Sequence, residues 1–313
     1  MMDWKTKSFI QNCVACLPEK MSYEIYFQIQ RHFGGLKRPH NPMRDFRNAV
    51  NILKKIRQHG YGINEKIFFE VGTGRVPLFP IAFWLGGARK TITVDLNPYL
   101  RNELILDMLF YIKNDKEQIQ NIFEDFLDIE RFNLLLDYSK SKSINKNSLM
   151  KLCQIEYIAP GDAAKSNLSE NSINYHVSNT VYEHIPLNII CNILIEGNRI
   201  ITNDGLFINN IDYSDHFAHI DKKISAINFL QYSDKEWKKY AGNKYMYMNR
   251  ARHDDFVEIF KSVGHDFVEI EPNKNEIILE MLKNGKINLD EKFKQKENEI
   301  LSIIGAKFIT KKK

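Results

Sequence analysis

The sequence predicts an α/β fold in which a mainly parallel β-sheet carries helices on both faces. Apolar runs typical of buried strands alternate with helical patterns through most of the chain. One such run, residues 67–71, is followed by a glycine turn, an apolar helix and a second strand at 91–94. Asp95 ends that second strand, about twenty residues beyond the glycines. This arrangement is how an α/β sheet holds a nucleotide-like ligand at the carboxyl ends of its strands.

The composition is that of an ordinary globular protein. The chain has 313 residues, of which 43% are apolar and 27% charged, so one elaborated domain or two small ones would fit. The net charge of +5 is spread along the chain, whereas a nucleic-acid binder normally carries a concentrated basic stripe. No apolar run approaches the roughly 20 residues that span a bilayer, and no signal peptide is recognisable. We therefore expect a cytoplasmic protein with no membrane span and no nucleic-acid partner.

Residues 1–60 are expected to form a helical extension ahead of the α/β domain at 61–313. Apolar residues recur at helical spacing in three segments, each ended by glycine or proline. These segments are 9–17, 23–33 and 42–59. Asn41 is expected to be the N-cap of the third helix, with Pro42 as its first residue. Such an extension either covers the edge of the sheet or forms a lid over the ligand site.

Beyond Asp95 lies a helical insertion, residues 97–154, which is larger than a simple crossover between strands needs. Residues 212–252 are polar, aromatic and irregular, and we expect them to form a lobe. Two closing strands, 266–270 and 276–282, are expected to pair through a turn at Pro272. The other expected elements, in chain order, are strands 155–158, 173–178, 206–211 and 306–310, a turn at 203–205, and helices 186–201 and 253–263.

The glycine turn narrows the choice of ligand. A dinucleotide-binding fingerprint needs a third glycine for close packing of helix and strand, and here that position is Pro77. A P-loop is excluded because no Gly-Lys-Ser/Thr follows. What remains is Gly72 and Gly74, with Glu70 two residues before the first glycine. A carboxylate at that position suits an ammonium group better than a phosphate.

Four segments in succession, EVGTGRVP, VDLN, GDA and SNTVYEHI, resemble the motifs of class I S-adenosylmethionine-dependent methyltransferases. The resemblance covers roughly residues 66–282 and omits the helical insertion. It implies an enzyme with a Rossmann-like, seven-stranded sheet whose last strand is antiparallel, and the strand pair expected at 266–282 agrees with that. It also implies S-adenosyl-L-methionine as the cofactor.

By matching position, the resemblance assigns the methionine end of the cofactor to the turn after the first strand. Gly72 and Gly74 would let the backbone approach it, and Glu70 would lie near its amino group. Asn179, after the fourth strand, would lie beside the transferable methyl. Two further residues of the turn are also assigned to cofactor binding, Thr73 and Pro77.

The resemblance assigns the adenosine end to the next two strand ends. Asp95 would accept hydrogen bonds from the ribose hydroxyls, with Leu96 beside the adenine. Asp162 would accept from the exocyclic amine, and Ala163 would lie at the adenine edge. A plain turn remains an alternative for Asp162, because Pro-Gly-Asp is also common turn chemistry.

Methyl transfer to a hydroxyl needs an aligned acceptor and a group that removes its proton, for which a neutral histidine is well suited. The segment YSDHFAHID, just after the fifth strand, also resembles bacterial methyltransferases associated with surface-polysaccharide genes. We predict that His216 is the general base or orients the acceptor. Asp212, Asp215 or His219 would support it, and no residue is assigned to a metal.

Other interpretations of these residues stay open. The acids and histidines of 212–221, including Asp221, could instead bind a divalent metal that orients acceptor hydroxyls, or the histidines could satisfy loop backbone groups. Glu183 and His184 could cap the following helix or take part in catalysis. Arg250 or Arg252 could pair with an acceptor phosphate or carboxylate, or belong to a folded surface lobe.

The sequence therefore predicts a methyltransferase that acts on an oxygen of a small polar or carbohydrate acceptor. The alternatives are a small-molecule N-methyltransferase and a non-catalytic, cofactor-binding partner protein. The acceptor pocket is expected from residues 1–60, 97–154 and 212–252, which carry no motif that names the acceptor. The oligomeric state is not predicted.

Overall fold

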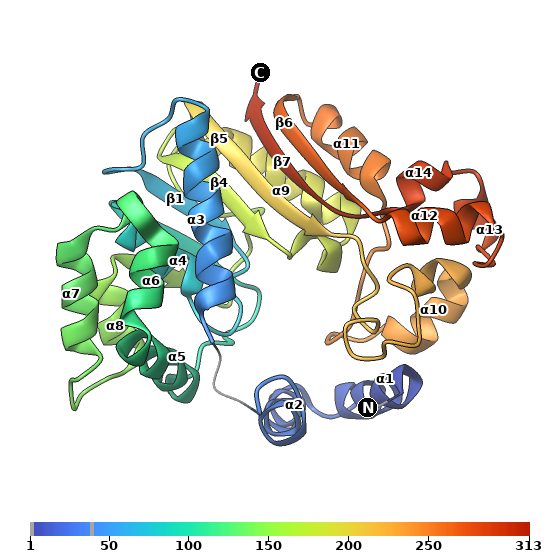
Figure 1. Ribbon diagram of the computed structural model, residues 1–313, viewed down its shortest axis with the longest axis horizontal. Helices are drawn as coiled ribbons and strands as arrows, with labels where there is room; N and C mark the ends of the chain where they lie inside the picture. Colours follow the sequence, from blue (N-terminus) through green and yellow to red (C-terminus); the bar gives the residue numbers. More distant parts are fainter. Residues whose placement is uncertain (1–2, 38–40) are drawn as a thin grey trace.

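The computed structural model describes residues 3–37 and 41–313 around one seven-stranded sheet of order β3-β2-β1-β4-β5-β7-β6. Neighbours from β3 to β5 pair in parallel, and β7 runs antiparallel to both β5 and β6 (Figure 1). The predicted mainly parallel sheet with an antiparallel last strand is confirmed. The strands are β1 Ile67–Val71, β2 Lys90–Val94, β3 Ile155–Ile158, β4 Ile173–Asn179, β5 Ile201–Asp212, β6 His265–Lys274 and β7 Ile303–Lys312.

Helices pack on both faces of the sheet, as predicted. Phe68 of β1 belongs to the core under the helices of the first group below, and its neighbour Phe69 belongs to the core under the second group. Because β1 is buried on both faces, its sequence is an almost continuous apolar run. The first group is α3 Met43–Gln58, α4 Leu78–Leu85, α5 Asn102–Asn114, α6 Lys116–Phe123, α7 Ile129–Tyr138 and α8 Lys146–Leu152. The second is α9 Leu187–Ile200 and α11 His253–Ser262.

A third hydrophobic core lies away from the sheet and joins the two ends of the chain. Trp4 is buried there, with ring centroids 5.2 Å from Phe217 and 4.8 Å from Tyr240. Ser8 Oγ donates a hydrogen bond to the carbonyl of Tyr240 at 2.7 Å. The first helix is thus docked on the lobe of residues 212–252, and Figure 1 shows it beside α10. The elements outside the two sheet layers are α1 Trp4–Ala15, α2 Glu19–Phe33, α10 Asp234–Ala241, α12 Glu276–Lys283, α13 Glu291–Lys294 and α14 Asn298–Leu301, with short 3₁₀ turns at Glu124–Phe126, Tyr182–His184 and Asn228–Gln231.

Two sequence predictions about strands are wrong. Residues 276–282 were expected to be a strand and form helix α12, because Asn275 caps it by accepting from the backbone N–H of Ile278 at 3.0 Å. The antiparallel partner of β6 is instead β7. The expected turn at 203–205 lies inside β5. The pairing between β4 and β5 shifts register there, and this irregularity accommodates the polar residues within the strand. Helix α3 begins at Met43, one residue later than predicted, and Asn41 Oδ1 accepts from its N–H at 3.0 Å.

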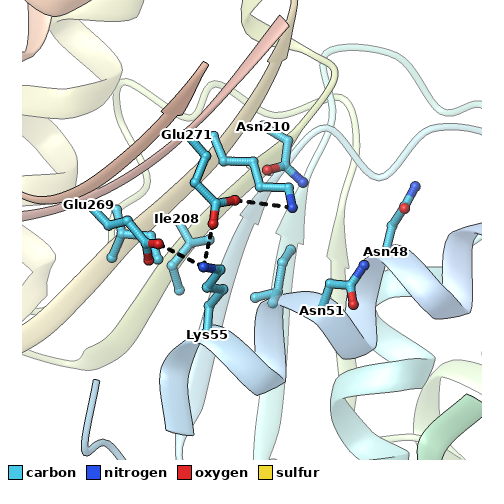
Figure 2. A pocket seen from close by; sticks show the side chains of 10 residues that line it. Asn48, Asn51, Lys55, Ile208, Asn210, Glu269 and Glu271 are labelled. Carbon is cyan, nitrogen blue, oxygen red and sulfur yellow. Dashed lines mark hydrogen bonds and ion pairs between the residues drawn. The ribbon is translucent and has the colours of Figure 1, made fainter. Parts of the chain in front are cut away.

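Ion pairs fix helix α3 to the sheet beside a cavity of about 50 Å³ (Figure 2). Lys55 Nζ lies 2.7 Å from Glu269 Oε1 and also contacts Glu271, both on β6. His59 contacts the other oxygen of Glu269 at 2.8 Å. Hydrogen bonding to Lys55 lowers the pKa of Glu269 to about 2. These charges pair with one another across the cavity wall and hold α3 against β6.

Candidate functional site

The turn after β1 adopts backbone conformations that favour glycine. Gly72 has φ +90° and Gly74 has φ +69°, both in the left-handed region. A Cβ on Gly72 would lie 2.4 Å from Cγ2 of Val181, so the loops after β1 and β4 touch there. A Cβ on Gly74 would meet no atom within 4 Å. Gly72 therefore permits close packing, whereas Gly74 leaves open space at the carboxyl edge of the sheet.

Glu70 lies beneath this turn and is only 3% exposed. Its carboxylate accepts a hydrogen bond from the hydroxyl of Thr93, which also contacts the hydroxyl of Thr73 at 2.5 Å. Burial raises the pKa of Glu70 to about 8. The carboxyl group is thus built into the base of the turn, and its contact with the cofactor's amino group stays a prediction.

The predicted adenosine-binding residues lie at the ends of β2 and β3. Asp95 Oδ2 accepts from the backbone N–H of Gly74 at 2.9 Å, which ties the glycine turn to β2. Burial raises the pKa of Asp95. Leu96 is 74% exposed. The carbonyl of Asp95 accepts from the N–H of Gly161 at 2.9 Å, so the two loops adjoin.

Asp162 and Ala163 follow directly in that second loop. Asp162 is exposed, and its Oδ1 accepts from the N–H of Ala164 at 2.9 Å, so it also has the turn role left open by the sequence. Ala163 is 7% exposed. Across the sheet, Asn179 at the end of β4 accepts from Asn210 Nδ2 of β5 at 2.9 Å. The ten predicted cofactor residues thus lie along one edge of the sheet, and the open space at Gly74 leaves room there for a ligand. Their contacts with the cofactor stay a prediction.

The three predicted catalytic residues lie together beyond β5. His216 Nε2 is 3.4 Å from Asp212 Oδ2, and His219 Nε2 is 3.7 Å from the same oxygen. The two imidazole rings stack at 4.8 Å, and the hydroxyl of Ser214 contacts His219 Nε2 at 3.0 Å. Burial opposes ionisation of Asp212, but the neighbouring His216 ring and the hydrogen bond from Ser214 lower its pKa to about 2. Burial lowers the pKa of His219, so its ring is neutral at pH 7.

Glu183 and His184 also belong to this cluster. The sequence left open whether they cap the following helix or take part in catalysis. The ring of His184 lies 4.8 Å from that of His216, and its Nδ1 contacts the carbonyl of Tyr247 at 2.8 Å. Glu183 is 2% exposed, and burial raises its pKa. Both of its carboxylate oxygens lack a hydrogen-bond partner in the described part of the chain. The signal available in the sequence was the position of Glu183 and His184 after β4, since neighbouring parallel strands end at the same edge.

Among residues 3–37 and 41–313, two sets of three side chains could hold a metal ion, with all ligand atoms of a set within 4.8 Å of one another. The sets are Glu183, His184 and His216, and Asp212, His216 and His219. Two acids of the metal hypothesis lie elsewhere. Asp215 accepts from Asn228 and from the backbone of Phe217, and Asp221 accepts from the backbone of Trp4 and Lys223. These two carboxylates therefore hold the lobe and the first helix together.

The two arginines considered for acceptor recognition are structural. Arg250 donates to the carbonyls of Phe229 and Tyr232 at 2.8 and 2.6 Å and pairs with Asp234. Arg252 is fully buried and donates to three carbonyls, those of Tyr213, Leu301 and Ile303. Both guanidinium groups are occupied in folding the lobe. An acceptor anion would therefore have to be bound by another cation.

Helix α2 connects the cofactor side of the site to the lobe. Tyr23 Oη donates to Asn97 Oδ1 at 2.8 Å, two residues beyond Asp95. Tyr26 stacks on Tyr245 of the lobe with ring centroids 3.9 Å apart. Between α2 and the loops after β1 and β2 lies a cavity of about 290 Å³. Its walls are Lys20, Tyr23, Glu24, Tyr26, Phe27, Arg75, Asn97, Pro98, Tyr99 and Arg101.

Comparisons with known proteins give similarity in structure only. No family model and no curated protein matches the sequence. A methyltransferase from Methanosarcina mazei is 9% identical, with a TM-score of 0.46, over 82% of this chain and 96% of that one. An S-adenosylmethionine-dependent methyltransferase from Mesorhizobium loti is 9% identical, with a TM-score of 0.44, over 83% and 96%. Magnesium protoporphyrin IX methyltransferase from Synechocystis, solved with bound SAH, is 10% identical, with a TM-score of 0.43, over 86% and 83%.

At such identities and TM-scores these likenesses carry no functional weight, so the function is inferred from the chain's own residues. Within residues 3–37 and 41–313, no helix combines the length and the apolar character needed to cross a membrane.

Proposed function

We propose that this chain is an S-adenosylmethionine-dependent methyltransferase that methylates an oxygen of a small polar or carbohydrate acceptor. The observation that carries the proposal is that two sets of residues meet at one sheet edge. Open space at Gly74 and the carboxylate of Asp95 lie at the ends of β1 and β2. Asp212 and His216 lie at the end of β5, and Asn179 of β4 lies between them in the strand order. The resemblance of YSDHFAHID to methyltransferases of surface-polysaccharide genes supports a carbohydrate acceptor.

The chain's part in the reaction is to position the acceptor and to remove its proton. When bound, S-adenosylmethionine supplies a methyl group on a sulfonium sulfur, and its transfer breaks the C–S bond, forms a C–O bond and leaves S-adenosylhomocysteine. His216 takes up the hydroxyl proton, which makes the acceptor oxygen a better nucleophile. Asp212, ionised at neutral pH, stabilises the resulting imidazolium from 3.4 Å. Neutral His219, stacked on His216, supports the ring orientation.

The direct test is methyl transfer to a panel of nucleotide sugars and glycan fragments, followed by formation of S-adenosylhomocysteine. We expect His216→Ala to lower kcat roughly 10²- to 10⁴-fold, the usual contribution of a general base. Calorimetry should show its affinity for S-adenosylhomocysteine unchanged. His59→Ala is the control, because His59 directly follows α3 and contacts Glu269 rather than the site.

Other results of these experiments would each contradict a different part of the proposal. Full turnover by His216→Ala would refute the base, and preferential transfer to amines that does not need His216 would indicate an N-methyltransferase. Cofactor binding without turnover on any acceptor would indicate a non-catalytic partner protein. No binding of S-adenosylmethionine or S-adenosylhomocysteine would refute the cofactor assignment itself.

A divalent cation is the alternative way to orient the acceptor, and the unpartnered carboxylate of Glu183 beside His184 and His216 is the observation in its favour. We expect exhaustive chelation to leave turnover unchanged, because His216 and Asp212 suffice to remove the proton. Loss of turnover on chelation, with recovery on adding Mg²⁺ or Mn²⁺, would replace the base mechanism by a metal-assisted one.

A further inference from the structure

The cavity under helix α2 contains a cation without a counter-charge. Arg75 follows Gly74 and lines this cavity, with its guanidinium 5.5 Å from the ring centre of Tyr99. Across the described residues, no carboxylate pairs with Arg75 and no oxygen accepts a hydrogen bond from its side chain. Burial lowers the pKa of Arg75, the direction expected when a charge loses water without gaining a partner. Arg75 is partly buried, so an anion in the cavity would give its guanidinium the partner that the described residues do not supply.

The rest of the cavity wall offers cations rather than acids. Lys20 and Arg101 also line it, and its one carboxylate, Glu24, is already paired with Arg101 at 2.8 Å. Lys244, from the lobe, lies over the ring of Tyr23 at 4.5 Å. The uncompensated charge of the wall is therefore positive.

The hydroxyl of Tyr26 adds a hydrogen-bond donor to these charges. Its oxygen accepts from Gln11 Nε2 at 2.9 Å, which leaves the O–H proton to donate. Tyr26 lines the cavity, and its ring stacks on Tyr245. A guanidinium with five N–H donors and a neighbouring O–H donor match the oxygens of a phosphate or carboxylate.

We propose that this cavity binds an anionic group of the acceptor, a phosphate or carboxylate, through Arg75. The inference rests on the proposed function and deepens it, since it restricts the acceptor to acidic or phosphate-linked molecules. Arg250 and Arg252, the arginines that the sequence offered for this role, are bound to backbone carbonyls. Unlike those two, Arg75 has no ion-pair partner and no hydrogen-bond acceptor within residues 3–37 and 41–313.

The position of the cavity favours the acceptor over the cofactor as the source of the anion. Five of its ten lining residues come from α2, which contacts the lobe through Tyr26 and Tyr245. The N-terminal extension and the lobe are two of the segments expected to form the acceptor pocket. The methionine carboxylate of the cofactor is the other anion within this chemistry, because Arg75 directly follows the glycine turn.

The test uses pyrophosphate as the anionic probe and the full chain, with binding measured by calorimetry in the presence and absence of S-adenosylhomocysteine. We expect Arg75→Gln to weaken pyrophosphate binding at least tenfold and to leave affinity for S-adenosylhomocysteine within about twofold. Arg75→Lys, which keeps the charge but not the bidentate geometry, should lose less. Arg89→Gln removes one charge from an exposed residue just before β2 and should bind pyrophosphate as the wild type does. Circular dichroism and thermal unfolding check that each variant folds.

Two results would overturn the proposal. One is a wild-type-like affinity of folded Arg75→Gln for pyrophosphate. The other is weaker binding of S-adenosylhomocysteine by Arg75→Gln without weaker binding of 5′-methylthioadenosine, which lacks the amino-acid carboxylate, since this assigns Arg75 to the cofactor. Failure of the proposed function is a separate result, because the pyrophosphate measurement without S-adenosylhomocysteine does not depend on cofactor binding.

Discussion

Replacement of Gly74 by alanine separates the role of this residue in ligand binding from its role in folding. Gly74 has φ +69°, and an added Cβ meets no protein atom within 4 Å, so the variant is expected to fold. The new methyl group would occupy the open space that the cofactor backbone contact requires. Gly74→Ala should therefore bind S-adenosylhomocysteine more weakly while remaining folded.

The expected losses of folding stability and of ligand affinity in Gly74→Ala can both be given a magnitude. Holding alanine in the left-handed region costs about 1–2 kcal/mol of folding free energy. A methyl group forced into an occupied site typically costs about 1–3 kcal/mol, which corresponds to a roughly 5- to 150-fold rise in Kd. At Gly72, by contrast, the Cβ would lie 2.4 Å from Val181 Cγ2, so overpacking of about 1–3 kcal/mol adds to the loss of stability.

The assay is calorimetric titration with S-adenosylhomocysteine, paired with chemical denaturation. Gly264→Ala is the matched control, because Gly264 has φ +79°, its Cβ also meets nothing within 4 Å, and it lies after α11, away from the glycine turn. The two variants should lose similar stability, and only Gly74→Ala should lose affinity. Wild-type affinity in Gly74→Ala, or an equal loss in Gly264→Ala, would refute the assignment of this turn to the cofactor.

Two further predictions concern stability. Glu70 has a pKa of about 8 in the folded chain against 4.5 as the ordinary value, so folding favours its protonated form and stability falls as pH rises from about 4.5 to 8. This pH dependence amounts to a change of at most about 4–5 kcal/mol in the free energy of unfolding. Glu70→Gln should remove it in denaturation series at pH 5–9, and an unchanged pH dependence would contradict the burial argument. Arg252→Met should lower the free energy of unfolding by about 3 kcal/mol or more, because three buried carbonyls lose their donor. A variant of wild-type stability with a raised KM for acidic acceptors would instead return Arg252 to the acceptor site.

The sequence predicted the sheet and the arrangement of its strand ends because both follow from short-range patterns. The run around Phe68, the two glycines after it and Asp95 are all local signals, and the order in which they occur places them at one edge of the sheet. The predicted strand at 276–282 was wrong because a short apolar segment suits either a helix or a strand. Only the cap at Asn275 and the third hydrophobic core determine that it is helical.

The candidate site was less predictable where it depends on contacts distant in sequence. Nothing near Arg252 in the sequence indicates that its guanidinium binds the carbonyls of Leu301 and Ile303. The sequence likewise does not predict that Arg75 lacks a counter-charge. This follows only from the cavity wall, where the one carboxylate, Glu24, is paired with Arg101. Partners of this kind come from tertiary packing, which a pattern of residue types does not encode.

Helix α2 also has a thermodynamic consequence. This 15-residue helix contacts Asn97, near the predicted ribose-binding Asp95, through Tyr23, and contacts Tyr245 of the lobe through Tyr26. Wherever a ligand on one side shifts the helix, it changes the contacts on the other side, so the two binding equilibria are linked. Reciprocity then requires that the acceptor alter cofactor affinity by the same factor as the cofactor alters acceptor affinity.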